Sequence, residues 1–373
     1  MSLRRASTPS LLGLACFALL LYAVAENSLS PERDPRYDEK LEAVSLMQDA
    51  EVAILSAKRR LDLPVDAEND PERYGVIGPQ FSLITTDRGT QAAKSLAAHP
   101  NFAAAVTRML VEAGVGDGDL VAVGMTGSLP GLNIAVLAAC RALGAEPVIT
   151  TSLGSSMFGA TDPELTWLDM ESILIARGVL PYKSAAASLG GGGDVGRGLS
   201  PAGRQLLLDA IERNGVRLLQ APNLLEALRT RVDLYDSEAR RRGKPIELYV
   251  NVGGGLVSLG GAQNARLVPA GLTRRLAARN YPNRGVVNVL GERGVPILNL
   301  LEVERVAREE GVTNLAGGTD APGEGPIFYT YRYNLWIVAG AALALLGANI
   351  FVLRLDIRQQ LLGRPHPEGR NPR

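Results

Sequence analysis

The sequence holds few of the residues on which many catalytic and metal sites depend. Among its 373 residues there are only two cysteines and two histidines. Cys16 lies in an apolar N-terminal run and Cys140 on the apolar face of a predicted helix, so we expect no disulfide. With only His99 and His366, a two-histidine zinc site within one chain is excluded, and no other metal-ligand spacing occurs. We interpret His99 as a residue of a loop or helix start rather than as the base of a histidine-dependent mechanism.

Aromatic residues and net charge are low as well. Aromatic residues make up 5% of the chain, and 39 basic residues balance 39 acidic ones. This balance produces no global field that favours nucleic acid, and the basic and aromatic composition of nucleic-acid binders is missing. We therefore expect no nucleic-acid partner. At 46% hydrophobic residues, the chain can form one large or two modest domains with a substantial core.

An apolar run near the N-terminus predicts export. Residues Leu11–Ala25 follow Arg4 and Arg5 without an intervening charge, as in a secretory signal. Ala23-Val24-Ala25 resembles a cleavage site, so the run is either a cleaved signal peptide or an uncleaved signal anchor.

A second apolar run, Leu335–Leu353, is long enough to cross a bilayer and carries no charge. Tyrosines and Trp336 gather before it, as in the aromatic belt of a membrane interface, and a basic tail follows. The positive-inside rule then places both chain ends in the cytoplasm if the first run is uncleaved, and the body outside the cell membrane. The lipid bilayer is thus an expected partner, and a buried core helix is the alternative interpretation of the run.

These features predict the domain organisation. The predicted segments are a cytoplasmic N-terminus (1–10), the signal anchor or signal peptide (11–25), a juxtamembrane helix and linker (26–73), an extracytoplasmic α/β domain (74–314), a linker (315–334), a transmembrane helix (335–353) and a basic cytoplasmic tail (354–373).

The stretch Leu120–Ser156 predicts how that domain is organised. It reads as a buried strand, a polar turn, a helix from Pro130 that ends at Gly144, a second strand and a second polar turn. Further strands and helices alternate along the body, which indicates a Rossmann-like α/β fold with a mainly parallel sheet. In such sheets ligands bind beyond the carboxyl ends of the strands, so we expect the polar turns to open on one crevice.

The other predicted elements follow from periodicity and from capping residues. Helices are predicted at Tyr37–Leu61, Thr90–Ala113 (one or two), Trp167–Ala176, Pro201–Asn214, Leu224–Arg231 and Val303–Glu310; strands at Val216–Leu219 and Glu247–Val252; further candidate elements at Arg284–Leu290 and Val295–Leu298.

Polar and glycine-rich turns supply the candidate ligand-binding residues. The turn after Leu120–Met125 opens a helix, where free N–H groups and the helix dipole favour anions, including carboxylates. It matches neither the Walker A loop nor the dinucleotide fingerprint, so a nucleotide is poorly supported. The predicted ligand-binding residues are Thr85, Thr86, Thr126, Gly127, Ser128, Ser152, Ser155, Ser156, Asn251, Gly253 and Gly254. We interpret Gly190–Gly193 as a simple flexible loop and Arg240–Lys244 as a solvated helix end.

Candidate catalytic residues are Ser128, Asp162 and Asp169. Ser128 lies on a strand-to-helix turn, although the G-x-S-x-G pattern is absent, and its base would be Lys183, a carboxylate or water. Asp162 and Asp169 could act as general acid and base, or hold a divalent cation; the alternative is an N-cap and a first-turn acid. Glu171 is interpreted as a solvated acid of the first helical turn. No other cofactor is predicted.

Three blocks of the sequence resemble the poly-γ-glutamate system protein family. These are an Ile84-Thr85-Thr86 stretch, the block Gly124–Ala139 and the block Gly159–Glu171, with Trp167 expected as a core residue. Gly131 stands where the family pattern has a residue such as alanine. The resemblance implies a membrane-associated accessory protein of poly-γ-glutamate synthesis or export. Its implied partners are the membrane subunits of the synthase and the polymer or a glutamate oligomer. The resemblance assigns no catalytic activity.

Three functions are therefore open. The body binds an anionic glutamate-type ligand or the synthase; or it is a serine-dependent hydrolase or transferase acting on the γ-glutamyl polymer; or it is a non-catalytic membrane scaffold.

Overall fold

The protein is described by a computed structural model that covers residues 8–313 and 318–362. The predictions for Arg4 and Arg5, for the start of the 315–334 linker and for the tail beyond residue 362 lie outside this range. Two compact units are present: Met1–Asp34 together with Tyr329–Arg373, and Pro35–Phe328.

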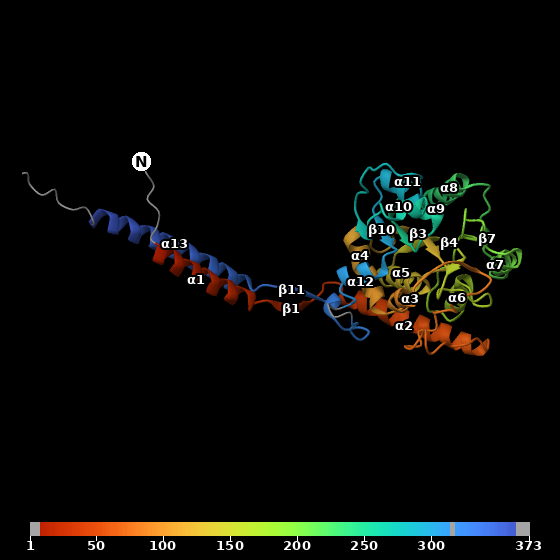
Figure 1. Ribbon diagram of the computed structural model, residues 1–373, viewed down its shortest axis with the longest axis horizontal. Helices are drawn as coiled ribbons and strands as arrows, with labels where there is room; N and C mark the ends of the chain where they lie inside the picture. The colour runs from red at the N-terminus through yellow and green to blue at the C-terminus, as the bar shows by residue number, and fades with distance from the viewer. Residues whose placement is uncertain (1–7, 314–317, 363–373) are drawn as a thin grey trace, which may run out of the picture. The chain divides into compact units, whose positions relative to one another are not determined.

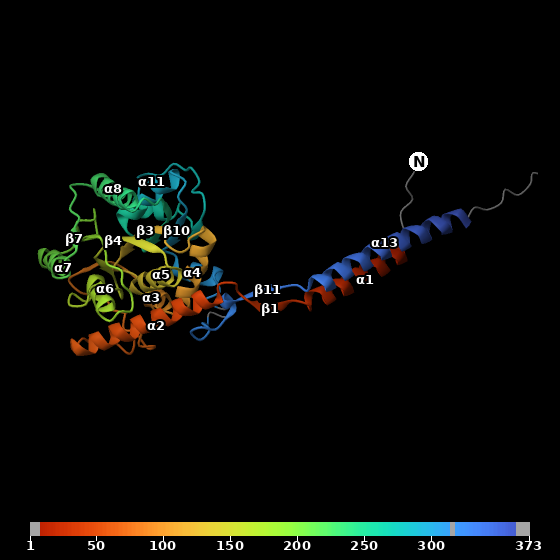
Figure 2. The ribbon, with the colours of Figure 1, turned by 180° about the vertical axis from the view of Figure 1, so that it is seen from behind.

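The first unit is built from both ends of the chain. Strand β1 (Ser30–Arg33) pairs antiparallel with β11 (Tyr329–Arg332), and these strands adjoin helices α1 (Thr8–Glu26) and α13 (Leu335–Leu362). Helices α1 and α13 run side by side in both views (Figures 1 and 2), and the Tyr333 hydroxyl donates to a Glu26 carboxylate oxygen at 3.1 Å. By length and composition, Pro9–Glu26 and Leu335–Arg354 could each span a membrane, and neither is buried inside the structure.

The second unit is a mixed α/β body with a mostly parallel central sheet. Its strand order is β7-β6-β4-β3-β8-β10-β9, and only β9 runs antiparallel to its neighbour, β10. The strands are β3 (Leu120–Thr126), β4 (Glu146–Ser152), β6 (Ala186–Ser188), β7 (Arg217–Leu218), β8 (Ile246–Val252), β9 (Gly271–Thr273) and β10 (Ile297–Leu300). From β3 the chain proceeds outward through β4, β6 and β7, and it then crosses to the other side of β3 to form β8, so the strand order reverses between β3 and β8.

Helices cover both faces of this sheet (Figure 1). One side carries α2 (Tyr37–Arg60), α3 (Gln91–Ala97), α4 (Asn101–Ala113), α5 (Pro130–Leu143), α6 (Trp167–Ala176), α7 (Pro201–Arg213) and α12 (Val303–Glu309); the other carries α8 (Leu224–Arg242), α9 (Leu256–Leu259), α10 (Ala262–Ala265) and α11 (Val286–Glu292). A short parallel pair, β2 (Thr85–Asp87) and β5 (Ser155–Ser156), lies outside the main sheet, and a 3₁₀ turn, Pro326–Phe328, precedes β11.

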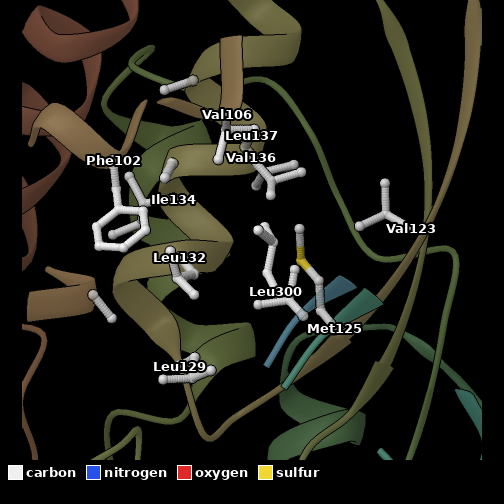
Figure 3. Close-up of a cluster of buried hydrophobic side chains, with 14 of the residues drawn as sticks. Phe102, Val106, Val123, Met125, Leu129, Leu132, Ile134, Val136, Leu137 and Leu300 are labelled. Carbon is white, nitrogen blue, oxygen red and sulfur yellow. The ribbon is translucent and has the colours of Figure 1, made fainter. Parts of the chain in front are cut away.

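The alternation of side chains along β3 explains why the sheet is buried on both faces. Val123 and Met125 point into the larger core with α4 and α5 (Figure 3), whereas Leu120 and Ala122 belong to a smaller core with α8 and α11. Every residue of β3 is buried, as an uninterrupted apolar run predicts. Helix α5 ends at Gly144, whose φ of 70° lies in the left-handed region that glycine tolerates best.

The body is larger than the sequence predicted. It begins at Pro35 rather than at Tyr74, because the apolar stripe of α2, including Val44, Met47 and Ile54, is part of the larger core. Helix α8 also extends to Arg242, beyond the predicted end at Arg231, and most of the Arg284–Leu290 stretch is helical.

Candidate functional site

A cavity of about 600 Å³ lies at the carboxyl ends of the central strands. Its wall includes Thr126 at the end of β3, Ser152 at the end of β4 and Gly253 after β8. It therefore adjoins the point where the strand order reverses, which is where open α/β sheets most often bind ligands.

The structure brings most of the sequence-predicted turns to this one cavity. The predicted ligand-binding residues that line it are Thr86, Thr126, Ser128, Ser152, Ser156, Gly253 and Gly254. The turn after β8 suits a close approach because Gly253 has a φ of 84°, and a Cβ there would collide with Thr126 Oγ1. Within the described residues, the N–H groups of Gly254 and Gly255 donate no hydrogen bond.

Other predicted ligand-binding residues support the wall from behind instead of lining it. Ser155 is fully buried and donates to the Gly127 carbonyl at 3.0 Å. The Asn251 side chain donates to Asn299 Oδ1 at 2.8 Å and to the Gly253 carbonyl at 2.9 Å. Thr85 accepts a hydrogen bond from the Ser82 amide at 2.9 Å. These contacts hold the turns in place, so the residues are structural neighbours of the cavity.

Lys94, which no sequence motif indicated, is a buried cation of the cavity lining. It lies on α3 and lines the cavity, but its side chain is only 7% exposed. Its Nζ donates to the Ser156 hydroxyl oxygen at 2.8 Å and also to the Ser128 carbonyl oxygen. The Ser156 amide in turn donates to the Ser128 hydroxyl oxygen at 2.9 Å. These contacts join α3, the start of α5 and β5.

Burial governs the ionisation of Lys94. Desolvation lowers its pKa from 10.5 to about 8, because the ammonium loses hydration without gaining a carboxylate partner among the described residues. The other charged side chains of the cavity are Asp87, Arg88, Asp194 and Arg197. Arg88 and Arg197 are exposed and add positive charge to its lining.

Asp194 is held by a buried ion pair with Arg231. One carboxylate oxygen of Asp194 lies 2.9 Å from Arg231 Nη2, and the other accepts from the hydroxyls of Ser152 at 2.9 Å and Ser188 at 2.8 Å. Both partners of the pair are less than 5% exposed. The backbone of Asp194 has a φ of 65°, so this network maintains an unfavourable conformation beside the cavity.

The glycine-rich loop, interpreted from the sequence as a simple flexible loop, forms part of the cavity wall. Gly190, Gly191 and Gly192 line the cavity, and the Gly190 carbonyl accepts from the Gly196 amide at 2.7 Å. Gly190 and Gly191 both have positive φ values, 72° and 64°. Glycine is therefore needed here to form a wall of exposed backbone.

The predicted acid–base residues lie elsewhere. Asp162 and Asp169 do not line the cavity that Ser128 lines, and both have other contacts. Asp169 completes a capping box with Thr166, which is the true N-cap of α6, and forms an ion pair with Arg213 at 2.6 Å. Asp162 accepts from the Glu164 amide at 3.0 Å in the preceding turn. Among the described residues no group of three or more His, Cys, Asp or Glu side chains could hold a metal ion.

Glu171 and Lys183 also differ from their predicted roles. Glu171 is buried instead of solvated, and it accepts from Trp167 Nε1 at 2.9 Å and from the Ser184 hydroxyl at 2.7 Å. Burial raises the pKa of Glu171 to about 7. Trp167 is fully buried, as expected of a core residue. Lys183 is exposed and does not line the cavity that Ser128 lines.

The remaining candidates are structural. His99 is buried just before α4, its Nδ1 accepts from the Asn101 amide at 3.2 Å, and burial lowers its pKa. Cys16 and Cys140 are both free, and Cys140 is buried. In the predicted solvated helix end, Arg242 and Lys244 both pair with Glu146, at 2.8 and 2.9 Å.

Comparison of the chain with models of protein families, with curated proteins and with solved structures gives no match.

Proposed function

We propose that this protein is a membrane-anchored accessory component of poly-γ-glutamate synthesis or export, and that its body binds a γ-linked glutamate chain in the cavity. The observation that carries the proposal is the buried Lys94 ammonium, which lacks a carboxylate partner among the described residues and faces a cavity walled by backbone and hydroxyl groups. A buried cation of this kind is stabilised by an anionic ligand. The reversal of strand order between β3 and β8 supports a Rossmann-like fold for the sheet.

The chemistry of the ligand follows from the donors that surround Lys94. A carboxylate accepts several hydrogen bonds, and Gly254 and Gly255, whose N–H groups donate no hydrogen bond among the described residues, also line the cavity. The N-terminal end of α5 adjoins the cavity at Leu129, so its dipole favours a negative charge there. A γ-linked glutamate chain carries one free carboxylate on each residue, which also suits the additional positive charges of Arg88 and Arg197.

Binding measurements on the full-length protein in detergent test this proposal. We expect labelled γ-linked glutamate oligomers to bind, and Lys94→Met to weaken binding about ten- to a hundredfold, since a hydrogen bond to a charged group contributes about 1.5–3 kcal/mol. Lys183→Met removes an exposed lysine outside the cavity and is the matched control. Absence of binding, or equal loss in both variants, would contradict the proposal. α-Linked oligomers of the same length test whether the linkage is recognised.

We further propose that α1 and α13 cross the cell membrane, with both chain ends in the cytoplasm and the body outside. The length and apolar character of the two helices, with the exposed Arg354 after the second apolar run, support this topology. Ser237→Cys introduces a thiol at an exposed position of the body, on a Cys16→Ala background that removes the other exposed thiol. In intact cells, labelling of this cysteine by a membrane-impermeant maleimide is expected; labelling only after lysis would reverse the topology.

A further inference from the structure

The contact between Lys94 and Ser156 has the geometry of a base and a nucleophile. Lys94 Nζ and Ser156 Oγ are 2.8 Å apart, within the reach that proton transfer requires, and both residues line the cavity. Ser128, the nucleophile suggested by the sequence, meets Lys94 through its carbonyl oxygen. Its hydroxyl accepts from the Ser156 amide at 2.9 Å and so helps to hold Ser156 in place.

The surroundings of Lys94 favour a neutral amine. The ammonium contacts neutral oxygen atoms, and its pKa of about 8 leaves a substantial fraction deprotonated at slightly alkaline pH. The charged side chains of the same cavity are Asp87 and Arg88 before α3 and Asp194 and Arg197 of the glycine-rich loop, and α12, which packs on α3, contributes Val303. Asp194 is neutralised by Arg231.

The backbone near Ser156 is strained. Phe158, two residues after Ser156, has a φ of 62°, in the left-handed region that a bulky side chain rarely adopts. It is held there between hydrogen bonds with Pro79 and Gly78. Such strain persists only where the surrounding structure enforces it, and it is concentrated at functional sites.

We propose that Ser156 and Lys94 form a nucleophile–base dyad that cleaves an amide bond bound in the cavity. That the amide belongs to a γ-glutamyl chain rests on the function proposed above; the dyad itself rests on the contact between the two side chains.

The reaction balances with water as the only co-reactant. Neutral Lys94 Nζ takes the Ser156 Oγ proton as the oxygen attacks the carbonyl carbon, and the resulting ammonium gives that proton to the leaving amine as the C–N bond breaks. Water then attacks the Ser156 ester, with Lys94 accepting a proton from water and returning it to Ser156 Oγ. The products are one carboxylic acid and one amine.

Covalent labelling of the full-length protein in detergent tests the dyad without its substrate. A biotinylated fluorophosphonate reacts with activated serines, and mass spectrometry of the tryptic peptides identifies the modified residue. We expect the label on Ser156, with a rate that rises as pH increases through about 8. Ser156→Ala and Lys94→Met should abolish labelling, whereas Ser237→Ala and Lys183→Met should react as the wild type does. The pH dependence of the labelling rate is measured on the wild type, so it tests the dyad even if a variant fails to fold.

The outcomes separate the dyad from ligand binding. Three results would overturn the dyad and leave the proposed function intact. These are a label on Ser128, a labelling rate that depends neither on Lys94 nor on pH, and the absence of any label on a protein that binds γ-linked glutamate oligomers. Label on Ser156 in a protein that binds no oligomer would support the dyad and overturn the γ-glutamyl ligand. Shortening of the oligomers by the wild type but not by Ser156→Ala would support both.

Discussion

Arg231 and Lys94 are buried cations of the same body with opposite surroundings. Arg231 is 2% exposed and meets the Asp194 carboxylate together with the hydroxyls of Ser152 and Ser188. Lys94 is 7% exposed, and its hydrogen-bond partners in the described part of the chain are neutral oxygen atoms of Ser128 and Ser156. The difference indicates their roles: a buried charge compensated within the protein maintains the structure, whereas one that is uncompensated remains available to a ligand or a proton.

The largest expected effect comes from breaking the compensated pair. Asp194→Asn leaves the Arg231 charge buried without a carboxylate, which should lower the free energy of unfolding by about 3–5 kcal/mol. Denaturant unfolding of the full-length protein measures this loss. Glu226→Gln, which breaks the exposed pair with Arg229, is the control and should cost less than about 1 kcal/mol. Equal losses in the two variants would remove the distinction between the buried pair and an exposed one.

The uncompensated cation should show itself in the dependence of stability on pH. Because the pKa of Lys94 is lowered from 10.5 to about 8, the unfolded chain binds more protons than the native protein between these values. The contribution of Lys94 to the free energy of unfolding therefore rises with pH from about 8 to 10.5, by at most about 3 kcal/mol. Lys94→Met should lack this rise, and Lys183→Met should retain it. Parallel curves for the wild type and Lys94→Met would show that Lys94 is not destabilised by burial.

A smaller effect is expected on ligand binding. The Lys94 ammonium, and not the neutral amine, attracts a carboxylate, so affinity for γ-linked glutamate oligomers should fall about tenfold between pH 7 and pH 9. The affinity of Lys94→Met should change little over the same range. Titrations of both proteins at the two pH values measure the difference; an identical decline in both would assign the effect to another group.

Elements whose signals are local could be predicted from the sequence. The strand at Leu120–Thr126 is an apolar run that ends at a polar turn, and α6 has the predicted bounds Trp167–Ala176. The crevice could be placed because parallel strands bring their carboxyl ends to one edge. Helix α2 was predicted from its periodicity, but its place in the core depends on contacts with α4 and α5, which periodicity does not contain.

The chemistry of the cavity depended on contacts that are distant in sequence. Lys94 meets Ser128 and Ser156, which are 34 and 62 residues away, and Asp194 meets Arg231. A local signal did exist for Lys94: Ala97 and Ala98, three and four residues later, are apolar, so the lysine adjoins apolar positions on one side of its predicted helix. Asp162 and Asp169 follow a polar turn, which is a position typical of a site, but turn formation accounts for Asp162 and helix capping for Asp169.

The two ends of the body meet. The ring of Tyr37, at the start of α2, lies 6.0 Å from that of Phe328, the last residue before β11, in an edge-to-face contact. In terms of connectivity, the body is thus an insertion into a helical hairpin formed by the rest of the chain. Replacing residues 35–328 by a short Gly-Asn turn should leave a hairpin that still inserts into the bilayer. Under the topology and function proposed above, membrane insertion and ligand binding would then be separable, each open to exchange without redesign of the other.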